Sequence, residues 1–380
     1  MTPSNFRLLV VRLGAMGDIL HALPAVTALR LAHPDWQIDW VVEPRWQALL
    51  AAESATPPSP PSSTQPLIDH LHFAATKAWR KAPFSRQTRT EFLALRSALR
   101  AAEYDAVIDL QGSLRSALIA SLAGCRRLIG EENPRERPAR WLFTERVLTR
   151  GAHVIEQDLE LAATIAGDKL QHVQPWLPVD PAAAAWVDGV LPKQEPGVKV
   201  HRLPGLKSET GGTQHFDDGQ LNDVQPAVLI NPGAGWGAKR WPAERYAAVA
   251  QGLVELGCCV FINVGPGEEP LAEVIVRQTH GAATALNCSL AQLIALTRRV
   301  RLAIAGDTGP LHLACALGVP VVGIYGPTDP SRNGPFGTRF TVLRSPQSRR
   351  DHTRYQAPEA GLLTIQPEEV LRVAGALLYP

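Results

Sequence analysis

The stretch Ile304–Pro330 reads IAGDTGPLHLACALGVPVVGIYGPTDP and predicts two buried strands joined by one helix. The first apolar run ends at Gly306-Asp307-Thr308-Gly309, where the glycines allow a tight turn and close approach of the backbone to a ligand. Either residue between them could cap the helix that carries His312, and the free N–H groups of that helix would favour an anion such as a diphosphate. The second run ends at the turn Tyr325–Pro330, so both loops should line one crevice of a parallel sheet. An ordinary strand–helix connection explains an isolated Asp-Thr-Gly equally well.

Composition indicates a globular chain of two domains. The chain has 380 residues, of which 45% are hydrophobic and 19% charged, and a usual domain holds roughly 100–200 residues. A formal net charge of +2 gives no reason to expect a nucleic-acid partner. No uninterrupted apolar run reaches the length of about 18 residues that a membrane span needs, and Met1–Arg7 lacks the pattern of a signal peptide. We therefore expect a cytoplasmic protein.

The cysteines stand mostly among apolar or small residues and lack the Cys-x-x-Cys spacing of many zinc and redox sites. We interpret them as reduced thiols of the core. They are Cys125, Cys258, Cys259, Cys288 and Cys315.

A glycine-rich turn near the N-terminus joins a short buried strand to a helix. The strand is Leu8–Val11, the turn is Gly14-Ala15-Met16-Gly17-Asp18, and apolar residues then recur at helical spacing through Arg30. A second strand at Ile38–Val42 completes a strand–helix–strand unit, which predicts a parallel sheet. Asp18 falls at the head of the helix. It is either an acid stabilised by the helix dipole or a functional carboxylate at the mouth of an interdomain cleft.

The segment Lys77–Arg89 holds five cations and no acid. A charge run of this kind is often plain solvated surface. Trp79 and Phe84 lie within it, however, and suggest a groove for an acidic, partly apolar ligand. A further strand at Ala106–Leu110 ends in the loop Gln111–Ser116, and we expect Arg115 to face the same crevice as Asp18.

A second sheet starts with a strand at Ala227–Asn231, followed by the glycine-rich loop Pro232–Trp241. Gly233, Gly235 and Ala238 could be misread as a dinucleotide fingerprint. A proline precedes the glycines, the helix begins several residues late, and the next strand ends without the expected ribose-binding acid, so a hydride-transfer cofactor is not expected. The loop instead delivers Lys239 and Arg240, which suit a departing phosphate.

Four other segments complete the chain. Thr56–Pro66, rich in proline and serine, and Pro192–Pro226, rich in glycine, proline and polar residues, are expected to be insertions. The turn Gly265–Glu269 offers a glutamate that could accept hydrogen bonds from ribose hydroxyls, or that simply starts a helix. Pro367–Leu378 is an amphipathic helix suited to packing across a domain boundary.

Several motifs together give the chain a resemblance to the lipopolysaccharide heptosyltransferases of glycosyltransferase family nine, and to heptosyltransferase I in particular. The resemblance covers nearly the whole chain apart from the two insertions. The motifs are Gly14–His21, Trp40–Glu43, Trp79-Arg80-Lys81, Tyr104–Gly112, Lys239-Arg240-Trp241-Pro242, Asp307–Ala314 and Tyr325–Thr328.

The resemblance implies an α/β fold of the GT-B type, in which two Rossmann-like domains with parallel sheets face an interdomain cleft. The acceptor-binding domain would span residues 1–178, and a linker with the insertion would span residues 179–226. The nucleotide-sugar domain would span residues 227–365, and residues 366–380 would form the helix across the boundary.

The resemblance also implies an inverting transfer of L-glycero-D-manno-heptose from ADP-heptose to 3-deoxy-octulosonic acid on lipid A. Asp18 would be the base that deprotonates the acceptor hydroxyl, and Lys239 would steady the charge on the leaving ADP. Thr308 and Gly309 would offer backbone N–H groups to the diphosphate. The full set of implied donor contacts is Gly233, Gly235, Lys239, Arg240, Glu269, Asp307, Thr308, Gly309 and His312. No metal or other cofactor is implied, since the sequence has no Asp-x-Asp motif.

The acceptor would lie on the basic cluster, which the resemblance places at the cytoplasmic face of the inner membrane as an electrostatic guide. The implied acceptor contacts are Gly17, Lys77, Arg80, Lys81, Arg86, Arg89, Gln111 and Arg115. The glycine-rich loop before Lys239 is closer to heptosyltransferase II, so a different core acceptor is the alternative. A non-catalytic sugar-nucleotide or lipopolysaccharide-binding protein is a third reading.

Overall fold

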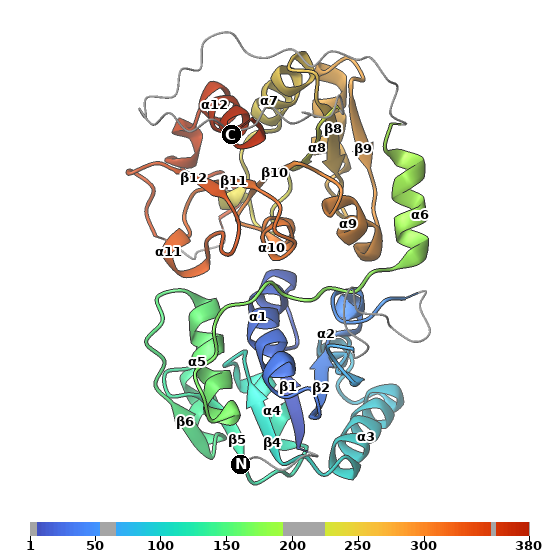
Figure 1. Ribbon diagram of the computed structural model, residues 1–380, viewed down its shortest axis with the longest axis vertical. Helices are drawn as coiled ribbons and strands as arrows, with labels where there is room; N and C mark the ends of the chain where they lie inside the picture. Colours follow the sequence, from blue (N-terminus) through green and yellow to red (C-terminus); the bar gives the residue numbers. More distant parts are fainter. Residues whose placement is uncertain (1–5, 54–65, 193–224, 351–354, 380) are drawn as a thin grey trace, which may run out of the picture.

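The computed structural model describes residues 6–53, 66–192, 225–350 and 355–379. The two expected insertions lie almost entirely outside those residues. Two six-stranded parallel sheets organise the described residues, one in each half of the chain (Figure 1). In each sheet the strands come from short runs rich in Val, Ile and Leu, as expected for strands that helices cover on both faces.

The first sheet has the strand order β3-β2-β1-β4-β5-β6. Its strands are β1 (Arg7–Val11), β2 (Gln37–Val42), β3 (His70–Phe73), β4 (Ala106–Asp109), β5 (Leu128–Glu131) and β6 (Glu145–Val147). Its helices are α1 (Met16–Ala32), α2 (Thr76–Lys81), α3 (Arg86–Ala101), α4 (Leu114–Ser121) and α5 (Val154–Ala166), with the 3-10 turns η1 (Pro44–Leu49) and η2 (Arg137–Trp141). One face of the sheet packs on α1 and α5, and the other on α3, α4 and η2.

The second sheet has the order β12-β11-β10-β7-β8-β9. Its strands are β7 (Ala227–Asn231), β8 (Cys259–Asn263), β9 (Ala283–Leu286), β10 (Leu302–Gly306), β11 (Val321–Tyr325) and β12 (Phe340–Arg344). The helices of this half are α6 (Pro181–Val190), α7 (Ala243–Glu255), α8 (Glu269–Gln278), α9 (Leu290–Thr297), α10 (Gly309–Ala316), α11 (Pro330–Asn333) and α12 (Pro367–Leu378), with the turns η3 (Gly237–Lys239) and η4 (Leu362–Thr364).

The strand order reverses beside the first strand of each sheet, between β1 and β4 and between β7 and β10. At such a reversal the loops after the two neighbouring strands diverge and leave a crevice beyond the carboxyl ends of the strands. The helices α1 and α10 begin at these two points, and Figure 1 shows them meeting between the domains. The prediction of a strand–helix–strand unit at Ile304–Pro330 is confirmed by β10, α10 and β11.

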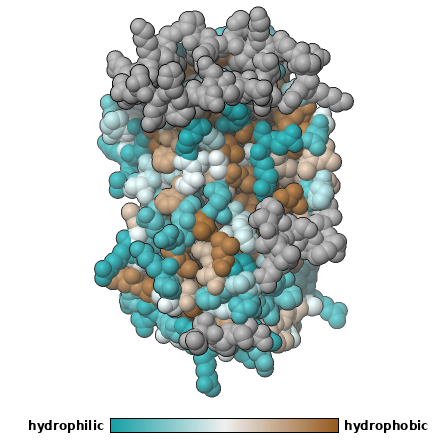
Figure 2. Space-filling model, viewed as in Figure 1, coloured by the Kyte–Doolittle hydropathy of each residue, from teal (hydrophilic) through white to brown (hydrophobic). Residues whose placement is uncertain are grey.

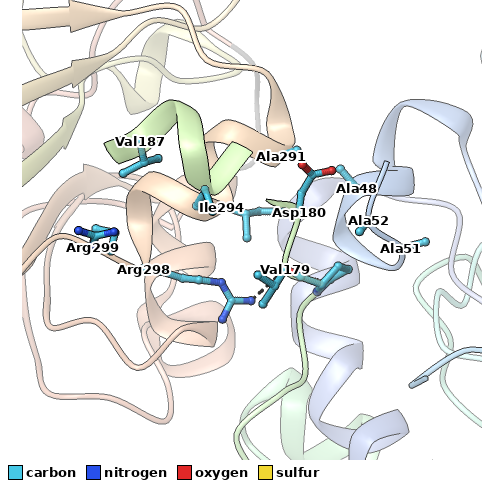
Figure 3. Close-up of a pocket in the computed structure, with 13 residues that line it drawn as sticks. Ala48, Ala51, Ala52, Val179, Asp180, Val187, Ala291, Ile294, Arg298 and Arg299 are labelled. Atoms are coloured by element: carbon cyan, nitrogen blue, oxygen red, sulfur yellow. Dashed lines mark hydrogen bonds between the residues drawn. The ribbon is translucent and has the colours of Figure 1, made fainter. Parts of the chain in front are cut away.

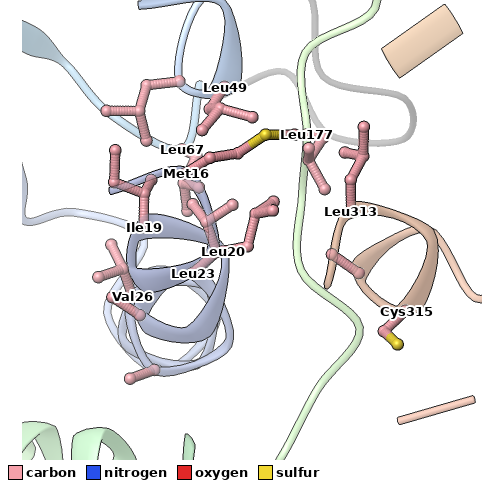
Figure 4. Packing of buried hydrophobic residues seen from close by; sticks show 14 of the residues in the cluster. Met16, Ile19, Leu20, Leu23, Val26, Leu49, Leu67, Leu177, Leu313 and Cys315 are labelled. Atoms are coloured by element: carbon pink, nitrogen blue, oxygen red, sulfur yellow. The ribbon is translucent and has the colours of Figure 1, made fainter. Parts of the chain in front are cut away.

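The domains share one hydrophobic cluster that continues across their boundary. Figure 4 shows Met16, Leu20 and Leu23 of α1 on one side, with Leu177 of the connecting segment and Leu313 of α10 on the other. Small residues let the two helices approach. A Cβ atom built on Gly309 would lie 2.6 Å from Sδ of Met16, and one on Gly17 would lie 2.8 Å from Cδ2 of His312. Any larger side chain at either glycine would push the helices apart.

The C-terminal helix does not pack where the sequence suggested. Instead of crossing the domain boundary, α12 packs on α7 and on β10, β11 and β12 of its own domain. An amphipathic pattern shows which face of a helix is apolar but not which neighbour covers it. The helix that follows the connection between the domains is α6, which packs on α9.

A groove of about 510 Å³ lies beside that connection, between η1, the segment before α6, and α9 (Figure 3). Its lining is mostly apolar and small, and Ala48, Val187 and Ile294 are among the lining residues. Arg298 donates hydrogen bonds to the carbonyl oxygens of Leu177 and Pro178, at 2.8 and 3.1 Å. The groove thus lies beside the segment that connects the two domains, and its lining includes no residue from the start of α1 or α10. The face seen in Figure 2 is mostly hydrophilic, with smaller hydrophobic areas.

Trp241 provides a test of the second core. Its side chain is 2% exposed, packs edge-on against Tyr246 with ring centroids 4.9 Å apart, and donates a hydrogen bond to the carbonyl oxygen of Ile365. Trp241→Ala should lower the free energy of unfolding by about 3–5 kcal/mol, measured by urea denaturation, because it leaves a cavity and an unpaired carbonyl. Trp141→Ala is the control, since Trp141 is 79% exposed and should change stability by less than about 0.5 kcal/mol. Equal losses of stability in the two variants would contradict the assignment of Trp241 to the core of the second domain.

Candidate active site

Asp18 lies at the start of α1, as predicted, with its carboxylate held from two sides. Its Oδ2 accepts a hydrogen bond from the backbone N–H of Ala15 at 3.1 Å, and its Oδ1 lies 3.6 Å from a guanidinium nitrogen of Arg12. The Asp18 side chain is 31% exposed, whereas that of Arg12 is 6% exposed. The carboxylate is therefore oriented by the protein but still reachable by a substrate.

Arg12 is a residue that the sequence interpretation missed. It directly follows β1 and is buried beside Asp18. Its positive charge also acts on two further buried carboxylates. Burial raises the pKa of Asp109 to about 6, against the hydrogen bonds from the backbone of Gly112 and Gln111 and the charge of Arg12. Burial likewise raises the pKa of Asp158 on α5 to about 7. The sequence did hold a signal for Arg12, because this cation directly follows a buried strand and precedes a glycine-rich turn.

Gln111, one of the implied acceptor contacts, is hydrogen-bonded to two parts of the first domain. Its side-chain oxygen accepts from the backbone N–H of Leu13 at 2.8 Å, and its side-chain nitrogen donates to Oγ of Ser113 at 3.2 Å. The side chain thus joins the loop after β4 to the loop that carries Asp18. Arg115, which we expected to face the crevice, donates to Oγ1 of Thr76 at 3.3 Å and so connects α4 to α2.

The opposite wall is made by the loops after β7 and β10. Nζ of Lys239 forms an ion pair with Oδ2 of Asp307, and its distance to the Asp307 carbonyl oxygen is 3.3 Å. The other carboxylate oxygen, Oδ1, lies 3.2 Å from Nε2 of His312. Burial opposes ionisation of Asp307, but the hydrogen bond from His312 and the charge of Lys239 hold its pKa well below the usual range. The sequence therefore placed these three residues together correctly.

The helix start after β10 differs from expectation in one detail. Thr308 is the N-cap residue of α10, but neither of the two candidates caps the helix with its side chain. The hydroxyl of Thr308 donates back to the carbonyl oxygen of Gly306 at 3.2 Å, and the Asp307 carboxylate is occupied by Lys239 and His312. The first N–H groups of α10 are thus left without side-chain caps, as an anion site requires.

The two glycines of the loop after β7, Gly233 and Gly235, have different surroundings. A Cβ on Gly233 would overlap the carboxylate of Glu268, while Gly235 has open space beside it. Arg240 donates from Nε to the carbonyl oxygen of Ala234 at 3.3 Å, so it also holds the loop in shape. Asn231, at the end of β7, is 3% exposed, and neither polar atom of its side chain has a partner among the described residues.

Two adjacent glutamates begin α8 and have different surroundings. Glu268 accepts from the backbone N–H of Gly265 at 3.0 Å and faces Gly233. Glu269, the predicted ribose contact, lines an open groove of about 990 Å³ together with Val264, Ala272 and Asn287. The sequence alone could not show which of the two glutamates faces the groove. At the start of a helix, neighbouring residues point their side chains to different faces.

The predicted basic cluster forms α2, the turn after it and the start of α3. Its cations, Lys77, Arg80, Lys81, Arg86 and Arg89, are all exposed. Partial burial lowers the pKa of Lys77, and the nearby charges of Arg45, Arg80 and Arg115 lower it further. Arg45 was not predicted. Trp79 is half-buried: it packs against the core of the first domain, and its Nε1 donates to Glu91 at 2.7 Å. Phe84 is 94% exposed.

Within the described ranges, no three His, Cys, Asp or Glu side chains are grouped as metal ligands. The five cysteines are free thiols, none of them exposed. A search of the described helices finds none with the length and hydropathy of a membrane span.

The fold and the site define a two-domain α/β transferase of the GT-B type, with a carboxylate from one domain and a lysine from the other at a shared boundary. The family model of glycosyltransferase family 9 (heptosyltransferase) matches residues 92–362. The chain therefore belongs to glycosyltransferase family 9, and it is a glycosyltransferase.

Individual relatives agree with this assignment. Lipopolysaccharide heptosyltransferase 1 of Escherichia coli K12 is 30% identical over 90% of this chain and 94% of its own length. Lipopolysaccharide heptosyltransferase 1 of Pseudomonas aeruginosa is 28% identical over 89% and 84%, respectively. The structure of the E. coli heptosyltransferase WaaC with ADP superposes with a TM-score of 0.73 at 25% identity, covering 98% of this chain and all of that one.

Asp158 gives a pH-dependent test of the buried charges around Arg12. Its pKa of about 7 in the folded protein exceeds the value of about 3.9 expected in the unfolded chain. Between these values the folded state holds a proton that the unfolded state lacks, so this group makes the protein less stable as the pH rises through that window. Asp158→Asn cannot ionise and should be at least about 1 kcal/mol more stable than wild type at pH 8 in urea denaturation.

The difference should shrink as the pH falls to 5, where the wild-type carboxyl is protonated. An Asp158→Asn variant that is less stable than wild type at pH 8 would contradict this prediction. It would mean that Arg12 or Arg332, whose charges both act on Asp158, pairs with an ionised Asp158.

Proposed function

We propose that the chain transfers L-glycero-D-manno-heptose from ADP-heptose to the 3-deoxy-octulosonic acid of lipid A, with inversion at the anomeric carbon. The observation that supports this most is the contact between the start of α1 and the start of α10. It brings Asp18, on the acceptor side, to the boundary where Lys239 and Asp307 lie. The relatives named above, one of them solved with ADP, support the same donor and acceptor class.

The donor would lie on the second domain, along the crevice between β7 and β10. The groove beside Glu269 and Asn287 suits the nucleoside, with a glutamate accepting hydrogen bonds from the ribose. The diphosphate would then meet Lys239 and the uncapped N–H groups of Thr308 and Gly309, which supply positive charge without a metal. Asn231 offers a further unpaired amide at the same edge. Gly235 leaves room for the ligand against the loop backbone, whereas the Glu268 carboxylate occupies the side-chain position of Gly233.

In the reaction, Asp18 would accept the proton of the acceptor hydroxyl as its oxygen attacks the anomeric carbon of heptose. The bond from that carbon to the diphosphate oxygen breaks, and ADP departs with the electron pair. Lys239 and the α10 N–H groups stabilise the charge that develops on ADP. A base of this kind typically contributes a 10²–10⁴-fold acceleration. Asp18 is suited to the role because Arg12 and the Ala15 N–H orient it, while part of its carboxylate stays exposed.

The acceptor would approach over α2, whose cations complement the carboxylate of 3-deoxy-octulosonic acid and the phosphates of lipid A. Lys77 lies in the first turn of α2 and Arg115 in the first turn of α4, and the charges of Arg45 in η1 and Arg80 at the end of α2 also act on Lys77. Charge-assisted hydrogen bonds to carboxylate and phosphate are the strongest that such side chains make. Gly17 would meet the acceptor sugar only through its backbone, because its side-chain position faces the ring of His312.

The outer part of the basic cluster would rest on the cytoplasmic face of the inner membrane. Phe84, at the turn between α2 and α3, is 94% exposed and is flanked by Lys81 and Arg86. An exposed aromatic side chain with cations on both sides of it in the sequence suits an anionic lipid surface, where the aromatic ring enters the interface and the cations meet the headgroups. This would bring the lipid-anchored acceptor to the crevice.

The proposed transfer is tested with ADP-heptose and de-acylated 3-deoxy-octulosonic-acid–lipid A, with mass spectrometry to detect one added heptose. Asp18→Asn should lower kcat by about 10²–10⁴-fold without changing the affinity for ADP, because only the base is lost. Lys239→Met should lower both kcat and ADP affinity. Asp188→Asn, which removes an exposed ion pair with Arg299, is the control and should leave both unchanged.

Unchanged turnover in Asp18→Asn would exclude it as the base. Absence of product with this acceptor, together with product on an acceptor that already carries one heptose, would favour the heptosyltransferase II-like alternative.

Membrane docking is tested by flotation with lipid vesicles. The wild-type protein should float with vesicles that contain anionic lipid and much less with neutral ones, and the binding should weaken as salt is raised. Phe84→Ser should reduce flotation several-fold while leaving transfer to the de-acylated acceptor intact. Phe340→Ser, at a 48% exposed phenylalanine of the second domain, is the matched control. Equal flotation of the two variants would exclude the α2–α3 turn as the docking surface.

A further inference from the structure

A chain of three side chains crosses the domain boundary beside the candidate active site. His21 lies on α1, one helical turn after Asp18, and is 5% exposed. Its Nε2 lies 3.1 Å from Nδ1 of His312 on α10. The other nitrogen of His312, Nε2, lies 3.2 Å from Oδ1 of Asp307, whose second oxygen pairs with Lys239. The chain therefore connects the helix that carries the proposed base to the lysine proposed for the leaving group.

The chemistry of the end groups sets the direction of these hydrogen bonds. An ionised Asp307 can only accept, so Nε2 of His312 donates to it. In a neutral His312 the remaining nitrogen, Nδ1, is an acceptor, and Nε2 of His21 must be the donor. Nδ1 of His21 then carries no proton. This agrees with its lack of a hydrogen-bond partner among the described residues. Burial is the main cause that lowers the pKa of His21, and the nearby charge of Arg12 acts in the same direction, so His21 stays neutral.

The contact between His21 and His312 leaves the two helices little freedom to move relative to each other. Both imidazoles are almost fully buried, and their rings meet edge-on with centroids 4.3 Å apart. Gly17 packs directly against the His312 ring, so the two helices can be this close only because residue 17 has no side chain. Movement of α1 relative to α10 by about 1 Å would take Nε2 of His21 out of hydrogen-bond range of His312.

We propose that His21 is a positioning residue, which through His312 and Asp307 fixes the distance from Asp18 to Lys239 across the domain boundary. This rests on the proposed function, since it assigns the base to Asp18 and the leaving-group cation to Lys239. Transfer needs the acceptor hydroxyl and the anomeric carbon held in line, and a misplacement of 1 Å can cost about 10²-fold in rate. His21 meets neither substrate; it acts only on the geometry of the two groups that do.

The test uses two amide substitutions of equal polarity but different reach. In His21→Gln the side-chain N–H₂ can occupy the position of Nε2 and donate to His312, whereas in His21→Asn it stands at the position of Nδ1 and cannot reach. His21→Asn should lower kcat by about 10²-fold, with the dissociation constant for ADP within about twofold of wild type. His21→Gln should recover at least tenfold of that loss.

His153→Asn is the matched control. His153 is also buried and also spans the domain boundary, with its Nε2 3.1 Å from the carbonyl oxygen of Gly334. Its Nδ1 accepts from the N–H of Ile155 at the start of α5, and asparagine keeps that cap while losing the bond to Gly334. The variant should retain kcat within a few-fold, because its interdomain bond does not lead to Asp307 or Lys239.

Three results would overturn the proposal: His21→Gln no better than His21→Asn, a loss in His153→Asn equal to that in His21→Asn, or a fall in ADP affinity in His21→Asn that matches the fall in kcat. The Asp18→Asn variant separates this proposal from the proposed function. If Asp18→Asn abolishes turnover while His21→Asn is fully active, only the positioning role fails. If Asp18→Asn is itself fully active, the assignment of the base fails and the positioning role fails with it.

Discussion

The structure depends on a head-to-head contact between two helix N-termini. The start of α1 meets the start of α10, and glycines at 17 and 309 allow the approach. Each helix start carries a partial positive charge, so bringing two together is unfavourable unless negative groups lie between or beside them. Asp18, in the first turn of α1, and Asp307, just before α10, supply that charge. The same concentration of positive potential makes the boundary a natural place for the diphosphate of a nucleotide sugar.

Buried charges around this contact form two groups, one in each domain. Arg12 lies near three carboxylates, those of Asp18, Asp109 and Asp158, whereas Asp307 lies between Lys239 and His312. Ion pairs of this kind add little net stability, because removing the charges from water offsets their attraction. Their value is that they hold charged groups in one orientation, which a base and a leaving-group cation both need.

Much of the fold and the main site groups could be predicted from the sequence, for one physical reason. Carboxyl ends of parallel strands share an edge, so Asp18, Lys239 and Asp307, each following a buried strand, had to lie at the crevice side of their sheets. What could not be predicted depended on side-chain direction or on the choice of neighbour. The sequence did not show that Trp79 packs against the core and donates to Glu91, that Gln111 joins two loops, or that α12 packs on its own domain. His21 gave no signal, since a histidine in an apolar helix has no visible partner until the other domain is placed.

The ion pair of Lys239 has a consequence for how the two domains work together. A diphosphate that draws Lys239 toward itself leaves one oxygen of Asp307 less compensated, while the other still accepts from His312. Asp307 then becomes a stronger hydrogen-bond acceptor for His312. This in turn polarises the hydrogen bond between His312 and His21. If the donor binds as proposed, its binding would thus strengthen the contact that holds α1 in place, and Asp18, the proposed base, would be held most firmly when there is a sugar to transfer.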